Sequence, residues 1–386
     1  MNELQLAVER LHDGARGIIR ETLSGPGIPS LDTDTGRYRV RPDYTPNEWK
    51  HFQWTGFLTG KLWLLSELTG DAALADGAAE ICRRIEPVLS SGPVTNENAG
   101  FDIFYTFSIG YNITGDEWYR QAAMRALDHY RTMYRPELGV FLCDADVSEM
   151  VIDTSGPLME FFWARGWDAD LGRVLKDHMD RTLELGLVKD DGSTMQGLEF
   201  DLHTGDVERY WARQSATGSS HWTRAQGWAM CNYMNGYEAT GDPVHLETVL
   251  NTARWFVDHT PHDTWVNAYD FDDERDDAPR DTCTSLMAAS TFLRLGRTEV
   301  ADAAEWSARG REILEVVCRD HMTYGGVVLH GSWGNVRASR GIGRFPLEDV
   351  MPYGNYWVVE GLYRALRDDW SALTLTPAAE RAAAPA

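Results

Sequence analysis

Two kinds of helix alternate along this chain, and their alternation restricts the fold more than any other feature of the sequence. One kind is apolar on nearly every face, which is typical of a helix enclosed by protein. The other kind has one apolar stripe and one charged face, which is typical of a helix at the surface. Such a chain must bury the first kind and cover it with the second.

Each kind occurs six times, in strict alternation. The apolar candidates run roughly over residues 54–68, 98–113, 153–164, 222–239, 281–295 and 354–368. The amphipathic candidates run roughly over 2–22, 71–88, 116–133, 168–186, 242–259 and 299–319. We therefore predict an all-α (α/α)6 barrel, a toroid of six inner and six outer helices that forms a single domain over residues 1–370. Residues 371–386 are of low complexity, and we expect a disordered tail there.

The junctions between the two kinds of helix carry matching turn signals. Thr-Gly-Asp ends an apolar segment and begins an amphipathic one at 69–71, 114–116 and 240–242. Glycine supplies the left-handed residue that ends one helix, and aspartate caps the next. Because these turns are short and the connections before the apolar helices are long, the long loops gather on one face. That face also collects the positive ends of six helix dipoles, and we expect the functional site there.

The bulk composition excludes several classes of function. The formal net charge is −23, and no basic patch or stripe of the kind that binds nucleic acid is visible. The same charge disfavours anionic membranes, and no stretch is long enough for a membrane span. The cysteines include no CxxC pair, so neither a zinc site nor a disulfide framework is expected. Since the N-terminus is charged and amphipathic rather than a secretory signal, we predict a cytoplasmic protein without metal or cofactor.

Asp153 begins one of the apolar helices, at the mouth of the predicted barrel. Met150, Val151 and Ile152 precede it, and mostly apolar residues follow it. Such surroundings desolvate a carboxyl and raise its pKa, whereas the positive end of a helix dipole lowers it. These opposed effects suit a group that must both donate and accept a proton. Asp281 also begins an apolar helix, but there we favour an ordinary N-cap.

A second carboxyl of interest belongs to Asp102. It lies four residues after Asn98, so the two side chains share one face of an otherwise apolar helix. A lone aspartate among apolar side chains is costly unless it is hydrogen-bonded or functional. A structural aspartate and a site residue therefore stand as equal interpretations of Asp102.

The segment HWTRAQGW gathers rings and planar donors at the start of another inner helix. It contains His221, Trp222, Arg224, Gln226 and Trp228. A tryptophan ring can stack on the face of a sugar, and Arg or Gln side chains can bind its hydroxyl or carboxylate groups. Tryptophans of this kind are usually core residues, but two of them beside an arginine and a glutamine favour a carbohydrate site.

Taken together, these stretches resemble the unsaturated glucuronyl hydrolases of glycoside hydrolase family 88 and, more distantly, the unsaturated rhamnogalacturonyl hydrolases. The matching stretches are WTGFLTGKLW, NAGF, IDTSGPLMEFFWA, WTRAQGW, RDTCTS and YGNYWVVEGL, which follow the family's order between about residues 50 and 368. The resemblance implies the (α/α)6 fold and a glycosidase activity.

Members of this family act on the 4,5-unsaturated uronic acid that polysaccharide lyases leave at the non-reducing end of an oligosaccharide. They hydrate its double bond: an aspartate protonates C4 and helps water to add at C5, and the aglycone then leaves. The resemblance places this role on Asp153 and implies substrate contacts for Trp222, for Gln214 eight residues earlier, and for Trp54 as an aromatic platform. We expect an oligosaccharide partner, no cofactor, and a monomer or homodimer.

The chain departs from the family pattern at three positions. Asn98 stands where the family has its second aspartate, Gln196 falls near a substrate-contacting histidine, and Asn355 replaces another aspartate. Asp102, one turn on, could supply the missing carboxylate, so the candidate catalytic set is Asp153, Asp102 and Asn98. Alternatively, the asparagine inactivates the enzyme, or the chain has diverged towards a different uronyl-like substrate or reaction. Because other motif positions differ as well, we favour divergence.

Two other classes of function remain as alternatives. Sugar epimerases and isomerases also use (α/α)6 barrels, but they usually need histidine bases at the mouth, and only His221 and His330 are candidates. A carbohydrate-binding relic without catalysis would follow from the loss of the carboxylate at position 98. We rank both below hydrolysis of an unsaturated uronyl group.

Overall fold

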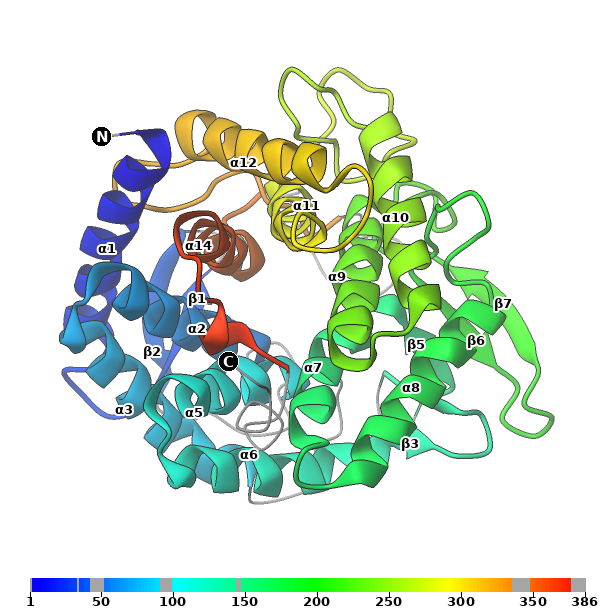
Figure 1. Ribbon diagram of the computed structural model, residues 1–386, viewed down its shortest axis with the longest axis horizontal. Coiled ribbons are helices and arrows are strands. Elements are labelled where there is room, and N and C mark those ends of the chain that lie inside the picture. The colour runs from blue at the N-terminus through cyan, green and yellow to red at the C-terminus, as the bar shows by residue number, and fades with distance from the viewer. Residues whose placement is uncertain are drawn as a thin grey trace.

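Six inner helical segments form a closed ring. The computed structural model describes residues 2–32, 35–41, 52–90, 99–143, 147–334 and 348–375. Neighbouring inner segments pack against each other in chain order, and the last packs against the first, which closes the barrel (Figure 1). The inner segments are α2 (Phe52–Thr69), α4 (Ala99–Ile103) continued by the π-helical turn η1 (Phe104–Ser108) and α5 (Ile109–Thr114), α7 (Ser155–Ala164), α9 (Thr223–Thr240), α11 (Thr282–Leu295) and α14 (Pro352–Leu366).

A second layer of helices surrounds this ring, as the alternating pattern predicted. Its members each pack on the inner helix next to them in the chain and turn a charged face outward. They are α1 (Glu3–Thr22), α3 (Ala72–Leu89), α6 (Glu117–Tyr130), α8 (Ala169–Glu184), α10 (Pro243–Asp258) and α12 (Ala303–Asp320). The predicted (α/α)6 architecture is therefore confirmed, with boundaries that differ by only a few residues.

The tight turns between inner and outer helices also have the predicted chemistry. Gly70, Gly115 and Gly241 all have φ close to +70°, the left-handed conformation that glycine adopts without strain. The aspartate that follows each of them caps the next helix, because its carboxylate accepts a backbone N–H two residues on. These short turns fix each outer helix antiparallel to its inner partner.

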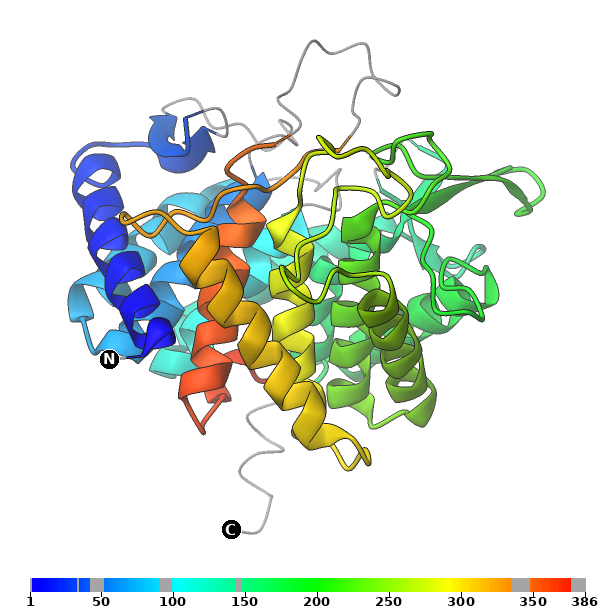
Figure 2. The ribbon, with the colours of Figure 1, turned by 90° about the horizontal axis from the view of Figure 1, so that it is seen from above.

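The long connections lie on the opposite face, at the N-terminal ends of the inner helices (Figure 2). They contain short antiparallel strands, namely the pair β1 (Ile28–Asp32) and β2 (Arg37–Arg41), the pair β3 (Tyr134–Arg135) and β4 (Val140–Phe141), and the three-stranded sheet β5 (Glu149–Val151), β6 (Gly197–Phe200) and β7 (Val207–Trp211). An isolated antiparallel bridge also joins Met322 to Val328 in the connection between α12 and α14.

The end of the described chain differs from the expectation of a disordered tail from residue 371. Residues 371–373 form the short 3-10 helix η4, and Ala372, Leu373 and Leu375 are buried. The side-chain amide of Asn112 donates to the carbonyls of Ala372 and Thr374, which ties this segment to α5. Buried apolar side chains and satisfied carbonyls outweigh the low complexity of the sequence here. Residues 376–386 lie outside the described residues.

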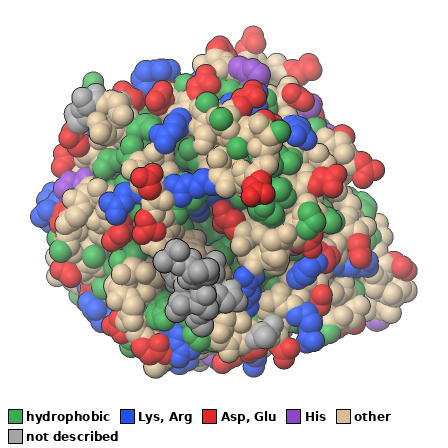
Figure 3. Space-filling view, in the orientation of Figure 1, with side chains coloured by type: hydrophobic (Ala, Val, Ile, Leu, Met, Phe, Trp, Pro, Cys, Tyr) green, Lys and Arg blue, Asp and Glu red, His purple; other side chains and the backbone are tan. Residues whose placement is uncertain are grey.

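Charge is distributed rather than concentrated on the face that carries the tight turns. Acidic and basic side chains are interspersed over that face in the space-filling view (Figure 3), so the net charge of −23 is not gathered there in one patch. Among the described residues, no helix has both the length and the apolar character that crossing a membrane requires.

Candidate active site

Asp153 lies on the 3-10 turn η3 (Ile152–Thr154), between strand β5 and the inner helix α7. Strand β5 pairs antiparallel with β6, and the Ile152 N–H extends this ladder by donating to the Gln196 carbonyl at 2.9 Å. The Asp153 side chain is partly buried, and its enclosed Oδ1 atom has no hydrogen-bond partner among the described residues. An inward carboxyl with one unpartnered oxygen is costly for folding and is a candidate for chemistry.

The surroundings of Asp153 bring its pKa close to neutrality. Burial raises the pKa of this carboxyl from 3.8 to about 7, while the positive charge of Arg224 and the residue's own backbone N–H lower it. The sequence predicted such opposed effects, although the charge that opposes burial comes from a side chain of another inner helix. A carboxyl with a pKa near 7 is populated in both its acid and its base form at neutral pH.

Arg224 is enclosed between two rings and one carboxylate. Its Nη1 donates to Oδ2 of Asp281 at 2.9 Å, and both side chains are almost completely buried. Its guanidinium carbon lies 4.9 Å from the centre of the Trp222 ring and 5.0 Å from that of Tyr353. Cation–π contacts and a buried ion pair hold this side chain in one place. Arg224 therefore presents a fixed positive charge close to Asp153.

Asp281 is the N-cap of α11, as predicted, and it also binds two residues outside that helix. Its Oδ1 accepts the N–H groups of Cys283 and, at 3.4 Å, of Ser332. Its Oδ2 takes the Arg224 bond described above. One aspartate thus joins the starts of α9 and α11 to the segment that follows residue 331.

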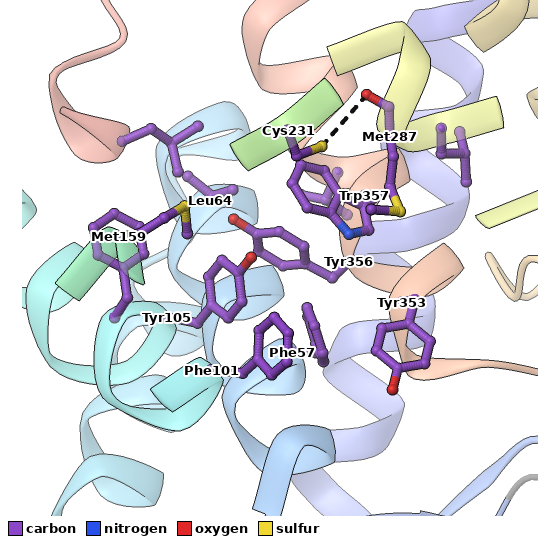
Figure 4. Close-up of a cluster of buried hydrophobic side chains, with 14 of the residues drawn as sticks. Phe57, Leu64, Phe101, Tyr105, Met159, Cys231, Met287, Tyr353, Tyr356 and Trp357 are labelled. Carbon is purple, nitrogen blue, oxygen red and sulfur yellow. Dashed lines mark hydrogen bonds between the residues drawn. The ribbon is translucent and has the colours of Figure 1, made fainter. Parts of the chain in front are cut away.

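Aromatic side chains line the barrel interior beneath Arg224. The ring of Trp228 lies 5.1 Å from that of Phe101 and 5.8 Å from that of Tyr353, and Phe57 lies 5.1 Å from Tyr353. Figure 4 shows Phe57, Phe101 and Tyr353 from three inner helices grouped together. Trp228 is therefore packed inside the barrel, with only about 2% of its surface exposed.

Two glutamines form a hydrogen-bonded chain that is connected to η3. The Gln196 amide nitrogen donates to Oε1 of Gln214 at 2.7 Å, and the Gln214 backbone N–H donates back to Oε1 of Gln196 at 3.1 Å. The Gln214 amide nitrogen then donates to the Trp333 carbonyl at 2.8 Å. Because Gln196 also accepts the Ile152 N–H, the chain connects η3 to the loop before α14. The structure thus brings both glutamines to the surroundings of Asp153.

Two residues that were predicted to contact substrate, Gln226 and His221, have side chains that bind other parts of the protein. The amide nitrogen of Gln226 donates to the carbonyls of Gly192 and Thr252, and Thr252 belongs to the outer helix α10. Nδ1 of His221 lies 2.9 Å from Asp272, and the ring lies 5.5 Å from that of Trp255, another residue of α10. Helical rotation explains the first case, since residues two apart point to nearly opposite sides of a helix.

Asp102 is completely buried one turn below the mouth. Its Oδ1 accepts the Gly56 N–H at 2.5 Å, and within the described part of the chain its enclosed Oδ2 has no hydrogen-bond partner. Burial raises its pKa well above the usual range, against the lowering effect of the Gly56 N–H. Burial therefore favours the neutral form of this α4 carboxyl, which packs against α2. This geometry favours the structural interpretation of Asp102.

Further predicted residues are placed in part or not at all. Asn98 lies outside the described residues, and although Trp54 is within α2, its side chain is not described. Asn355 is buried in α14, where its oxygen accepts the Val328 N–H and its nitrogen donates to the Met351 carbonyl. His330 pairs with Glu348 in the connection between α12 and α14.

The sequence analysis missed two residues of this site. Tyr353 stacks on Arg224, and its place in the stretch YGNYWVVEGL was a signal that could have identified it. Asn232 donates from α9 to the Ile152 carbonyl, directly before Asp153. A buried asparagine eight residues after Arg224 on the same helix was its only signal.

One group of described side chains has the composition of a metal site, and it lies in the outer layer. Asp180, Asp242 and His245 come together between α8 and α10. The Lys176 ammonium binds both carboxylates, at 2.5 Å from Asp180 and 3.1 Å from Asp242. The positive charge of this lysine therefore already offsets part of the negative charge of the two acids.

Comparisons with known proteins agree with the motif resemblance. No protein-family model matches the chain. It is 26% identical over 375 residues to the unsaturated glucuronyl hydrolase of Bacillus sp. (strain GL1), an alignment that covers 92% of this chain and 95% of that protein. The solved unsaturated glucuronyl hydrolase from Streptococcus agalactiae has a TM-score of 0.84 at 20% identity, with 96% of this chain and 93% of that chain covered.

A mutant of the Streptococcus agalactiae enzyme was solved in complex with dGlcA-GalNAc6S. It has a TM-score of 0.77 at 21% identity and covers 95% of this chain and 92% of that chain. The expected resemblance to unsaturated glucuronyl hydrolases is thus confirmed in sequence and in fold. The chain is a relative of named glycosidases over nearly its whole length.

Proposed function

We propose that this chain is a glycosidase that removes an unsaturated uronyl residue from the non-reducing end of an oligosaccharide. The observation that carries the proposal is Asp153, a carboxyl with a pKa of about 7 at the start of an inner helix and within the field of a buried arginine. The relatives support the substrate class, since the Bacillus protein is named an unsaturated glucuronyl hydrolase and the Streptococcus agalactiae mutant holds an unsaturated disaccharide.

In the proposed mechanism, Asp153 first donates a proton and then accepts one. Its acid form protonates C4 of the C4=C5 double bond, which leaves positive charge on C5 that the ring oxygen shares. Water adds to C5 and returns a proton to the carboxylate, so the side chain ends in its starting state. The resulting hemiketal opens and the aglycone leaves. One carboxyl suffices because its pKa makes both forms available at neutral pH.

The remaining residues of the site bind and orient the sugar in this proposal. Arg224 acts through its charge rather than by direct contact, because its side chain is buried and paired with Asp281. Trp222 and Tyr353 keep the guanidinium in place by stacking on it. Gln214 and Gln196 offer amide groups to sugar hydroxyls. We assign no proton transfer to Asp102, whose carboxyl is completely enclosed.

The alternatives make different demands on these residues. An epimerase would need histidine bases beside the substrate, whereas His221 pairs with Asp272 and His330 with Glu348. A binding relic would keep the arginine and the rings but would not need an acid with a pKa near 7. Both therefore rank below the hydrolase. Since Cys82, Cys231, Cys283 and Cys318 are buried thiols, we propose a reducing, cytoplasmic setting after extracellular or periplasmic lyases have acted.

The direct test incubates the purified chain with unsaturated disaccharides from chondroitin, heparin, ulvan and xanthan lyase digests. Loss of the ultraviolet absorbance of the double bond is the expected result, and in heavy water deuterium should appear at C4 of the product. Asp153→Asn should abolish the loss, whereas Asp263→Asn, an exposed aspartate before α11, should not. Unchanged absorbance with every substrate would contradict the proposed activity.

A further inference from the structure

Both backbone polar groups of Ile152, the residue before Asp153, are hydrogen-bonded. The Ile152 N–H donates to the Gln196 carbonyl at 2.9 Å, and the Ile152 carbonyl accepts from Nδ2 of Asn232 at 3.0 Å. The first bond only continues the β5–β6 ladder. The second comes from a side chain on a different element, the inner helix α9, eighty positions further along the chain.

Asn232 is an unusual residue for its position. Only about 4% of its surface is exposed, and its neighbours on α9 include Cys231 and Tyr233, both buried. A buried side-chain amide is costly unless its groups are hydrogen-bonded. Its nitrogen has the Ile152 carbonyl as a partner, while its oxygen has none among the described residues. Packing alone therefore does not explain why an asparagine occupies this position.

A small cavity lies next to η3, between β5, α8 and α9. It measures about 10 Å3 and is lined by Val151, Ile152, His178, Met179, Thr182, Asn232 and Tyr233. This volume is near the lower limit for one water molecule. A water there would donate to the unpartnered Asn232 oxygen. Asn232 therefore lines this cavity and also binds the Ile152 carbonyl at its edge.

We propose that Asn232 is the positioning residue of Asp153: by holding the Ile152 carbonyl it fixes the orientation of the carboxyl at the start of α7. This inference rests on the proposed function of Asp153. The connection is short, because the carbonyl that Asn232 binds and the N–H that faces the Asp153 carboxyl belong to the same peptide. A hydrogen bond to a peptide carbonyl polarises the peptide and strengthens its N–H as a donor. Asn232 therefore supports the ionised form of Asp153.

Few other charged groups compete with this effect. Arg224 on α9 is the charge that reaches Asp153 among the described residues. His178, behind η3 on α8, is neutral, because burial lowers its pKa to about 3 and its Nδ1 accepts the Phe141 N–H. On β5, Glu149 is paired with Arg213, and Gln196 next to β6 carries no charge. A pH effect of an Asn232 substitution would therefore report on the Ile152–Asp153 peptide.

The test compares Asn232→Leu and the milder Asn232→Ser with Asn235→Ala. Asn235 is matched in type, helix and burial, but its side chain accepts from Arg294 far below the site. We expect kcat to fall about 10- to 100-fold in Asn232→Leu with KM nearly unchanged, since a misplacement of about 1 Å can cost that much. The alkaline limb of the pH profile should move to higher pH. Asn235→Ala should alter neither kcat nor the profile.

A second readout does not need activity. In protein labelled with carbon-13 at aspartate Cγ, the resonance missing from Asp153→Asn gives the pKa of Asp153 directly, and Asn232→Leu or Asn232→Ser should raise that pKa. If wild-type protein turns over no substrate but the resonance still shifts, the proposed function fails and the positioning role stands. If wild-type protein is active but folded Asn232 variants keep its kcat and its Asp153 pKa, the positioning role is wrong.

Discussion

The guanidinium of Arg224 donates to the carboxylate of Asp281 across 2.9 Å, with both side chains closed off from solvent. This pair connects the starts of two neighbouring inner helices, α9 and α11. It also holds the Arg224 charge in a fixed position, from which that charge lowers the pKa of Asp153. The pair therefore connects two helices and also provides the positive charge that acts on Asp153.

Replacing Arg224 with methionine should affect the site in two separable ways. The pKa of Asp153 should rise, because the positive charge that lowers it is gone, so the alkaline limb of the pH profile should move to higher pH. The free energy of unfolding should fall by about 3–5 kcal/mol, because Asp281 is left buried and unpaired. The double variant Arg224→Met/Asp281→Asn should recover stability but not activity. Recovery of both would show that the charge has no role in catalysis.

The wild-type pH profile should have its alkaline limb near neutrality. The first proposed step needs the acid form of Asp153, and a carboxyl with a pKa of about 7 loses that form as the pH rises through 7. An ordinary aspartate would lose it near pH 4, about three units lower. Measuring kcat/KM from about pH 5 to about pH 9 separates the two. A rate that keeps rising to the alkaline end would contradict the role of Asp153 as the acid.

Asp102→Asn should have little effect on the catalytic rate. Burial raises the pKa of this carboxyl and so favours its neutral form, and an asparagine oxygen can still accept the Gly56 N–H. We therefore expect activity within about tenfold of wild type, whereas loss of a general acid or base costs about 100- to 10,000-fold. Rates measured beside Asp153→Asn under identical conditions provide the comparison. Equal losses in the two variants would restore Asp102 as the missing second catalytic carboxylate.

Gly56→Ala should destabilise the barrel, because α2 and α4 touch at this residue. A methyl group there would lie 2.7 Å from the Asp102 Cα and from the Phe101 carbonyl oxygen, both of which are backbone atoms. Such overpacking costs about 1–3 kcal/mol in the free energy of unfolding. Gly17→Ala on the surface helix α1 is the matched control, where the nearest atom is a side-chain nitrogen at 3.9 Å. The control should be neutral or slightly stabilised in denaturant titrations.

Glu160→Gln should stabilise the protein more as the pH rises. Glu160 on α7 is fully buried, and burial raises its pKa from 4.5 to about 8, against the effect of the Ser108 hydroxyl at 2.5 Å. Keeping this acid protonated while the unfolded chain ionises costs stability that grows from about pH 4.5 and levels off above about pH 8. The gain in the glutamine variant should follow the same curve in unfolding experiments. A pH-independent difference would mean that Glu160 is ionised in the fold.

Local rules explain why the fold could be predicted so closely. Helix periodicity identifies which face of each segment is apolar, and Gly-Asp at 70–71, 115–116 and 241–242 marks where one helix ends and the next begins. The same rules show their limit at Gln226. It sits two residues from Arg224 in one motif, yet half a turn of helix directs its amide towards α10. Applying the periodicity inside the motif would have separated the two.

The sequence by itself determined the alternation of inner and outer helices, the tight turns, the face that carries the long loops, and Asp153 as the carboxyl to examine. These follow from interactions within a few residues of the chain. Only the tertiary structure decided the partners of that carboxyl. Arg224 meets Asp281 and Tyr353, and Asn232 reaches Ile152, because a closed ring of six helical segments brings together residues far apart in sequence. Which side chains meet depends on where each inner helix begins along the barrel axis, and no local pattern encodes that.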